Sequence, residues 1–172
     1  MDDKNTGNVA KKIEMVANVA IIIAAVAIVI LFLRNYTKSQ PGEHVISAGT
    51  KFALKGVDWQ SNGKSVVLAI STTCHFCTES AGFYRVLVDQ CKQQHVRTVA
   101  VLPQAAPEAK AYLQNEGVSV DEIRQSVLSD LEVSGTPTLL LIDKGGIVKS
   151  VWVGKLRSDE EKEVLAKLTS SS

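Results

Sequence analysis

The chain has little cysteine, no excess charge of either sign and no internal repeat. Three cysteines in 172 residues are too few, and too odd in number, for a framework of structural disulfides. Lys and Arg total 19 against 18 Asp and Glu, a formal net charge of +1 that offers no broad attraction to nucleic acid or acidic lipid. The length suits one domain with an appendage. Nucleic acid is therefore not an expected partner.

One long apolar run lies near the N-terminus. Residues 15–33 carry no charge, and Asn18 is their only polar side chain. A helix over this run would span about 28 Å, close to the roughly 30 Å hydrocarbon core of a bilayer. A cleavable signal peptide has a shorter apolar region and a small-residue cleavage site, whereas this run continues directly into "RNYTKSQPGE". We predict an uncleaved, single-pass transmembrane anchor over residues 13–33; the alternative is a buried core helix.

Basic residues on both sides of the run indicate its orientation. Lys4, Lys11 and Lys12 precede it, and Arg34 and Lys38 follow it. This small excess favours a cytoplasmic N-terminus. The rest of the chain is then expected on the extracytoplasmic side, periplasmic in a bacterium, where a reversible disulfide can persist.

The composition divides the chain into five segments. The polar stretch after the anchor contains Pro41-Gly42 and has no periodicity, which is typical of a tether. The predicted segments are an N-terminal flank (1–12), the anchor (13–33), a linker (34–47), a folded domain (48–169) and a tail (170–172).

Hydrophobic periodicity predicts an α/β domain. Strands are expected at 51–59, 65–71, 96–102, 136–143 and 147–154, and helices at 74–94 and 107–116. The last two strands form a hairpin across Lys144-Gly145-Gly146. Ser158 and Glu161 form a capping box that begins a final helix. Residues 118–133 fit either a helix or a strand at their start.

The stretch "STTCHFCTES" places Cys74 and Cys77 where a buried strand gives way to a helix. Unpaired backbone N–H groups and the helix dipole favour a thiolate at Cys74, and a protonated His75 would add to this effect. Cys77 follows one helical turn later, where two Cα atoms lie about 5 Å apart, within the range of a disulfide. We predict thiol–disulfide exchange, with Cys74 as nucleophile and Cys77, more buried, as resolving cysteine.

With these features in order, the chain resembles the thioredoxin-like proteins, and within them the membrane-anchored TlpA/ResA-type thiol–disulfide oxidoreductases. The resemblance rests on "SVVLAISTTCHFC" and "SGTPTLLLIDKGGIVKSVWVG" and covers about residues 48–168. It implies a thioredoxin-like fold, with a central mixed sheet flanked by helices, and an oxidoreductase that needs no cofactor. Its expected partners are protein thiols or disulfides and an upstream redox protein, and its role is cell redox homeostasis.

The resemblance also assigns the loop facing the cysteines. It implies that Pro137, preceded by Thr136, is the family's cis-proline. The Thr136 backbone would then pair with an incoming chain as an added strand and help to select substrates. The segment "PEAKAYLQNEGVSVDEIRQ" is similar to the element that this branch inserts.

Some residues depart from the family pattern. Thr73 stands where many relatives have tryptophan, and "HF" provides no proline between the cysteines. Leu68 and Ala69 stand where thioredoxins place a buried aspartate or an asparagine, and Gln104 lies near the glutamate of the cytochrome-maturation branch. These departures argue against cytochrome maturation and against a proton shuttle at those positions.

The remaining cysteine and the histidines have simpler interpretations. Cys91 falls on the apolar face of the predicted helix and is expected to be a core residue. His75 either tunes the cysteine pair or is simply solvated. The spacing of Cys74, Cys77, Cys91 and His95 is similar to that of a zinc finger. A straight helix would place residues 77 and 91 about 21 Å apart, so we expect no metal.

Two other functions remain as alternatives. A thiol peroxidase of the peroxiredoxin type shares this fold, but its P-x-x-x-T-x-x-C pattern would require proline and threonine where the chain has Val67 and Ser71. The other alternative is a tethered binding or chaperone module in which the cysteine pair is incidental.

Overall fold

The computed structural model describes residues 21–22, 24–30 and 46–169. The chain divides into two units, Met1–Glu43 and His44–Ser172. In the first unit the described residues are helical and exposed. Over the described ranges, no helix has the length and apolarity needed to cross a membrane. The rest of the predicted anchor, the predicted flank (1–12), most of the predicted linker and the predicted tail (170–172) lie outside the described residues.

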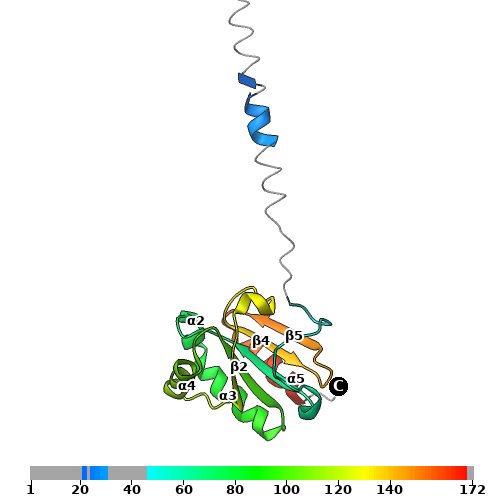
Figure 1. The fold of residues 1–172 in the computed structure, drawn as a ribbon, viewed down its shortest axis with the longest axis vertical. Coiled ribbons are helices and arrows are strands. Elements are labelled where there is room, and N and C mark those ends of the chain that lie inside the picture. Colours follow the sequence, from blue (N-terminus) through cyan, green and yellow to red (C-terminus); the bar gives the residue numbers. More distant parts are fainter. Residues whose placement is uncertain (1–20, 23, 31–45, 170–172) are drawn as a thin grey trace, which may run out of the picture. The chain divides into compact units, whose positions relative to one another are not determined.

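The second unit is built on a five-stranded mixed sheet in the order β3-β2-β1-β4-β5 (Figure 1). The strands β1, β2 and β3 are parallel, β4 is antiparallel to β1, and β5 is antiparallel to β4. The two central apolar runs, "SVVLA" and "TLLLI", are buried along their whole length, as expected of strands covered on both faces. The strands are β1 (Ser65–Ala69), β2 (Arg97–Leu102), β3 (Glu122–Gln125), β4 (Thr138–Ile142) and β5 (Val148–Val153).

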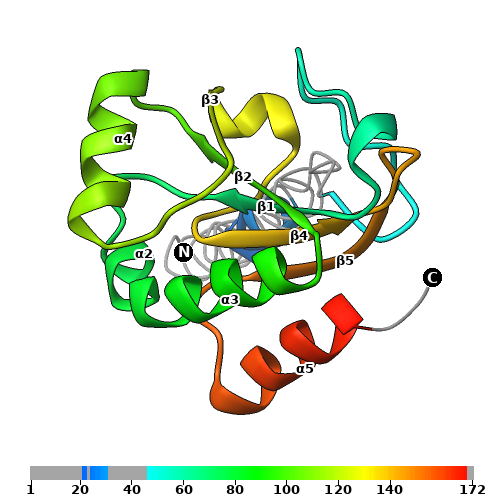
Figure 2. The same ribbon diagram turned by 90° about the horizontal axis from the view of Figure 1, so that it is seen from below.

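Helices cover one face of the sheet. The helices α3 (Ala81–Gln93), α4 (Ala106–Asn115) and α5 (Ser158–Thr169) contribute Leu87, Leu113 and Leu168 to one core cluster. This cluster also contains strand residues whose side chains point to that face. Figure 2 shows α3 and α5 side by side below the sheet. The short helix α2 (His75–Glu79) joins the end of β1 to α3.

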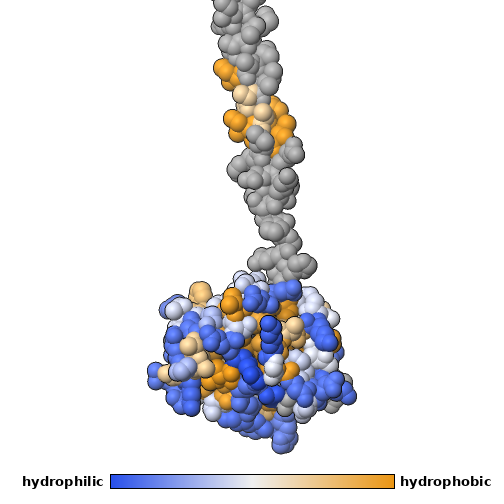
Figure 3. Space-filling model, in the orientation of Figure 1, coloured by the Kyte–Doolittle hydropathy of each residue, from blue (hydrophilic) through white to orange (hydrophobic). Residues whose placement is uncertain are grey.

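The opposite face is covered mainly by irregular chain. Ile46, Phe52 and Trp59 pack there in a second core cluster, together with Leu131 from the short helix η2 (Leu128–Leu131). Ile46, which falls in the predicted linker, is buried, and its N–H donates to Glu132 O at 2.9 Å. Apolar surface gathers near the middle of the face shown in Figure 3, with hydrophilic surface around it. Residues 46–59 therefore cover this face of the sheet, and we call them the lid.

Two local predictions differ from the structure. Residues 51–59 form no strand; a single bridge joins Lys51 to Ile147, and η1 (Gln60–Asn62) follows. The single helix predicted over 74–94 is divided into α2 and α3 at Ser80. The Ser80 hydroxyl and N–H both donate to Phe76 O, at 2.8 and 3.1 Å, and such bonding to the preceding turn bends helices.

One further segment is resolved and one further prediction is wrong. The ambiguous segment 118–133 contains β3 and the helix η2. The predicted capping box of Ser158 and Glu161 is wrong, because the capping interaction of α5 lies one residue earlier. The N–H of Arg157, immediately before the helix, donates to the Glu160 carboxylate at 2.8 Å. Because a capping carboxylate reaches back from the third helical position, a helix that begins at Ser158 uses Glu160 and not Glu161.

Candidate active site

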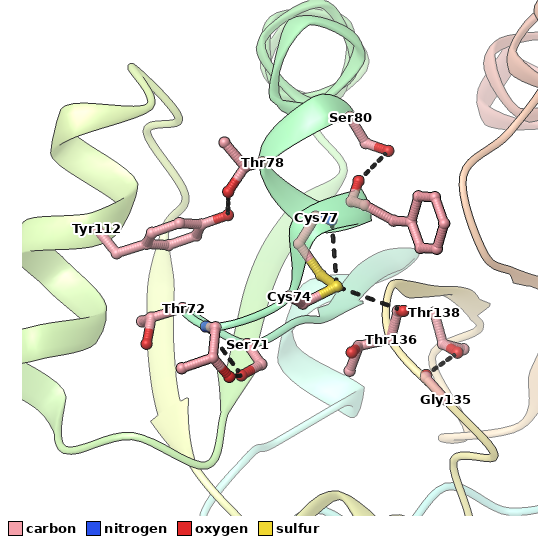
Figure 4. Close-up of a disulfide and its surroundings, with 12 residues drawn as sticks. Ser71, Thr72, Cys74, Cys77, Thr78, Ser80, Tyr112, Gly135, Thr136 and Thr138 are labelled. Carbon is pink, nitrogen blue, oxygen red and sulfur yellow. Dashed lines mark hydrogen bonds between the residues drawn. A yellow bond between two sulfur atoms is a disulfide. The ribbon is translucent and has the colours of Figure 1, made fainter.

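The two neighbouring cysteines form a disulfide at the carboxyl end of β1 (Figure 4). Cys74 is the residue immediately before α2 and is half-buried, whereas Cys77 lies in the first turn of α2 and is fully buried. Their Cα atoms are 5.2 Å apart, as the sequence spacing predicted. The unequal exposure makes Cys74 the sulfur that an incoming group meets first.

Two backbone groups contact the Cys74 sulfur. The N–H of Cys77 donates to Cys74 Sγ at 3.2 Å, and Thr136 O lies 3.4 Å from the same sulfur. In the dithiol form, an N–H directed at the sulfur stabilises a thiolate, and a nearby carbonyl accepts the S–H of the neutral thiol. The N–H contact fits a nucleophilic Cys74, whereas the carbonyl favours its neutral thiol; the assignment of roles to Cys74 and Cys77 stays a prediction.

The loop before β4 lies directly beside the disulfide. Its Thr136–Pro137 peptide bond is cis. β4 begins at Thr138, which pairs with Ala69 at the end of β1, so the loop and the cysteine turn meet at the same edge of the sheet. The Thr138 hydroxyl donates to Gly135 O at 2.7 Å. The structure brings the two predicted substrate-binding residues next to the cysteines; their role in binding stays a prediction.

His75 is exposed and turned along α2. Its Nε2 lies 3.0 Å from a Glu79 carboxylate oxygen, and the other Glu79 oxygen accepts from Lys155 Nζ at 3.0 Å. The bond from Lys155 is the largest cause of the lowered pKa of Glu79. Neither Glu79 nor Lys155 was identified from the sequence, because an ion pair between distant segments leaves no local pattern. The tuning role of His75 stays a prediction.

Polar side chains from α4 and its entry reach the segment on either side of the cysteines. Gln104 and Glu108 contact Ser71 and Thr72, and Tyr112 contacts Thr78. Sequence reasoning noted Gln104 only for its position and missed Glu108 and Tyr112. Their spacing of four residues was the one available signal, and it is common on helices.

Cys91 is a free, fully buried thiol on α3, which confirms that it is a core residue. Burial raises its pKa from 9.0 to about 12. Over the described part of the chain, no group of three or more His, Cys, Asp or Glu side chains is arranged to hold a metal ion.

The high pKa of Cys91 predicts alkaline destabilisation of the fold. The raised pKa means that the neutral thiol is favoured in the folded state, so its contribution is fully present below about pH 9 and is lost as pH rises toward 12. We expect Cys91→Ala to lose less stability than the wild type between pH 9 and 12, as measured by urea unfolding at each pH. Equal losses in the two proteins would contradict this assignment.

The burial of Cys91 also predicts its reactivity. In the native protein at pH 8, Cys91 should resist alkylation until the chain is unfolded.

Comparison with known proteins supports the fold. No family model matches the chain, and no curated protein matches it in sequence. Among solved structures, it is similar to the thioredoxin domain of a thiol-disulfide oxidoreductase from Bacteroides vulgatus, with a TM-score of 0.58 and 15% identity over 73% of this chain and 99% of that one. A thiol-disulfide isomerase from Corynebacterium glutamicum has a TM-score of 0.54 and 16% identity, over 74% and 95%. The peroxidoxin BcpB from Mycobacterium tuberculosis has a TM-score of 0.58 and 16% identity, over 73% and 99%. The domain therefore has a thioredoxin-like fold.

Proposed function

We propose that this protein is a membrane-anchored thiol–disulfide oxidoreductase that exchanges electrons with protein cysteines through Cys74 and Cys77. The observation that carries the proposal is the unequal pair itself. A half-buried sulfur sits before a helix, contacted by a backbone N–H, and is bonded to a fully buried sulfur one turn later. A disulfide that served only to staple the fold would not need one sulfur at the solvent edge.

In the reducing direction, the Cys74 thiolate attacks one sulfur of a client disulfide. A bond forms between Cys74 Sγ and that sulfur, and the other client sulfur leaves as a thiolate and takes a proton from solvent. The Cys77 thiol loses its proton and attacks Cys74 Sγ, which closes the Cys74–Cys77 disulfide and releases the second client thiolate. Two electrons pass from the pair to the client. In the oxidising direction the same steps run in reverse, and the relative stability of the dithiol and disulfide forms decides the direction.

The client is proposed to bind along the Thr136–Pro137 loop. Thr136 O lies 3.4 Å from Cys74 Sγ, so backbone pairing at Thr136 would bring an extended client chain to the reactive sulfur. A hydrogen bond from the residue after β5 fixes the loop: the Gly154 N–H donates to Pro137 O at 2.7 Å. Two exposed apolar side chains offer contacts for client side chains: Phe76, between the two cysteines in sequence, and Val153, which pairs with Thr138 next to the loop.

The anchor and the location of the domain are part of the proposal. The uncharged run of 15–33 and the basic residues before it support a single span with the domain on the extracytoplasmic side. The test is protease treatment of intact cells or spheroplasts. In treated spheroplasts the protease should digest the domain from outside. In untreated cells the intact chain should remain with the membrane fraction after a carbonate wash. A domain digested only after membrane lysis would reject the orientation.

The activity is tested with the full chain and a model disulfide, such as that of insulin, with a dithiol as electron source. The wild type should catalyse reduction and Cys74→Ser should not. A wild-type chain inactive in both directions, in reduction and in the oxidation of a reduced client, would reject the proposal. Full cellular function in a Cys74→Ser strain would favour the binding or chaperone alternative.

Peroxidase activity is the second candidate, favoured by the similarity in fold to the mycobacterial peroxidoxin. It predicts rapid consumption of hydroperoxide by the reduced chain with oxidation of Cys74 to a sulfenic acid. Val67 and Ser71 do not match the peroxiredoxin pattern, so we expect hydroperoxide to react with Cys74 no faster than with an ordinary thiolate.

A further inference from the structure

Three polar side chains, at positions four residues apart in the sequence, form hydrogen-bond contacts with the segment that carries the disulfide. They are Gln104, two residues before α4, and Glu108 and Tyr112, one turn apart within it. We call these three residues the α4 clasp. Glu108 and Tyr112 are one helical turn apart on α4, so one rigid element presents both, and Gln104 is presented by the segment that leads into the helix.

The clasp holds the segment ahead of Cys74 by three hydrogen bonds. Gln104 Oε1 accepts from the Thr72 N–H at 3.3 Å, and Gln104 Nε2 donates to Ser71 Oγ at 2.9 Å. The Thr72 hydroxyl donates to Glu108 Oε1 at 2.8 Å. The side chain of Ser71 is buried, and its Oγ also lies 3.1 Å from Thr73 Oγ1, so Gln104 is one of its partners and the one that comes from outside the cysteine turn.

The third member of the clasp contacts the segment beyond Cys77. The Tyr112 hydroxyl lies 3.2 Å from Thr78 Oγ1, within hydrogen-bond distance, as Figure 4 shows. The pKa of Tyr112 is raised, mainly by burial, so this hydroxyl stays neutral and is available as a donor. The clasp therefore holds the cysteine turn at both ends.

Ser71 connects Gln104 to the backbone of Cys74 through hydrogen bonds. The N–H of Cys74 donates to Ser71 O at 3.1 Å, and the N–H of Thr73 donates to Ser71 Oγ at 3.3 Å. Fixing Ser71 thus fixes the backbone that leads into Cys74, and with it the sulfur that accepts from the Cys77 N–H. When the Cys74 sulfur and the Cys77 N–H are held in a fixed geometry, this donor stabilises a thiolate more than a mobile donor would, because it need not reorganise when charge develops.

The simpler interpretation is that these contacts only attach α4 to the domain. α4 already packs through Ala109 and Leu113, which are 1% and 2% exposed and belong to the main core cluster. Attachment of the helix therefore does not depend on the clasp. Gln104 is also uncharged, so its influence on a thiolate would have to act through geometry.

We propose that Gln104, Glu108 and Tyr112 are positioning residues that hold the cysteine turn in the geometry that stabilises the Cys74 thiolate. The inference rests on the proposed function, since it concerns the reactivity of the same sulfur. It predicts that loosening the clasp raises the pKa of Cys74 while the fold remains intact.

The test measures the pKa of Cys74 in the reduced full chain, from the rate of alkylation against pH, in a Cys91→Ala background. We expect Gln104→Ala and Thr72→Val to lower the alkylation rate at pH 7 by roughly threefold to tenfold, the effect of one lost hydrogen bond. Thr72→Val removes one hydroxyl and keeps the shape of the side chain, so it decides the question if Gln104→Ala does not fold. Gln114→Ala is the matched control, because Gln114 is an exposed glutamine on α4 that lines a cleft with Val118 and Ile123.

Substitutions of Glu108 distinguish a positioning effect on Cys74 from the direct effect of the Glu108 charge on its pKa. Removing a negative charge near Cys74 would lower the pKa of its thiol, whereas releasing the clasp would raise it. Glu108→Ala should therefore raise this pKa, and Glu108→Gln, which keeps an acceptor for Thr72, should restore the wild-type value or a lower one. Thr72→Val combined with Glu108→Ala should act no more strongly than either alone.

The proposal is overturned if Gln104→Ala and Thr72→Val leave the pKa of Cys74 unchanged, or if Glu108→Ala lowers it. It is also overturned if thermal unfolding of the oxidised variants changes while this pKa does not, since the clasp would then be structural only. The proposed function fails on a different observation, a wild type that exchanges with no model disulfide. The pKa of Cys74 can still be measured in that event, so the two failures are distinguishable.

Discussion

Cys77→Ala is expected to turn the protein into a trap that stays disulfide-linked to its clients. In the proposed mechanism, Cys77 attacks the mixed disulfide as an intramolecular neighbour, one helical turn from Cys74. Without it, release depends on thiols from solution, which should slow resolution by roughly a thousandfold or more, given the effective molarities of well-oriented groups. Non-reducing electrophoresis of membranes from cells that express Cys77→Ala should show adducts that a reductant removes.

Three variants assign the trapping sulfur. Cys77→Ala with Cys91→Ala should trap as many clients as Cys77→Ala alone, because Cys91 is fully buried and its pKa is about 12. Cys77→Ala with Cys74→Ser should trap none. Adducts joined through Cys91 would contradict the roles given to the three cysteines.

The central strands of the domain could be predicted because each has a strong local signal. "SVVLA" and "TLLLI" are continuous apolar runs, and the structure buries both of them completely. The cysteine pair at the end of the first run is equally local, since a strand followed by a helix fixes where its sulfurs lie. The position of the Thr136–Pro137 loop beside them came from resemblance, because it depends on the pairing of β4 with β1 across more than sixty residues.

The parts that sequence reasoning missed depend on contacts between distant segments. Phe52 and Trp59 belong to the lid over one face of the sheet, but irregular chain has no period that would reveal its buried positions. Glu108 and Tyr112 look like ordinary exposed residues of a helix until the fold places Thr72 and Thr78 beside them. The break at Ser80 was missed because serine is common both inside helices and at their ends.

Gly146→Ala is expected to destabilise the domain strongly, although it lies in the β4–β5 hairpin, away from the cysteines. Gly146 has φ of +77°, and a Cβ added there would lie 2.8 Å from Trp59 Cδ1. Trp59 is 9% exposed and packs against Phe52, with ring centroids 6.0 Å apart, so the indole has little room to move. The left-handed backbone costs about 1–2 kcal/mol for alanine, and overpacking costs about 1–3 kcal/mol more.

Gly49→Ala is the matched control, because Gly49 has φ of +93° and nothing lies within 4 Å of an added Cβ. It should cost only the backbone term, about 1–2 kcal/mol. The free energy of unfolding of each full-chain variant is obtained from urea titrations followed by tryptophan fluorescence. A Gly146→Ala cost no larger than that of Gly49→Ala would show that Trp59 moves aside freely, and the lid would then be loosely packed. Because the hairpin does not contact Cys74, folded Gly146→Ala should retain the wild-type pKa at that sulfur, which separates the stability of the lid from the chemistry of the cysteine turn.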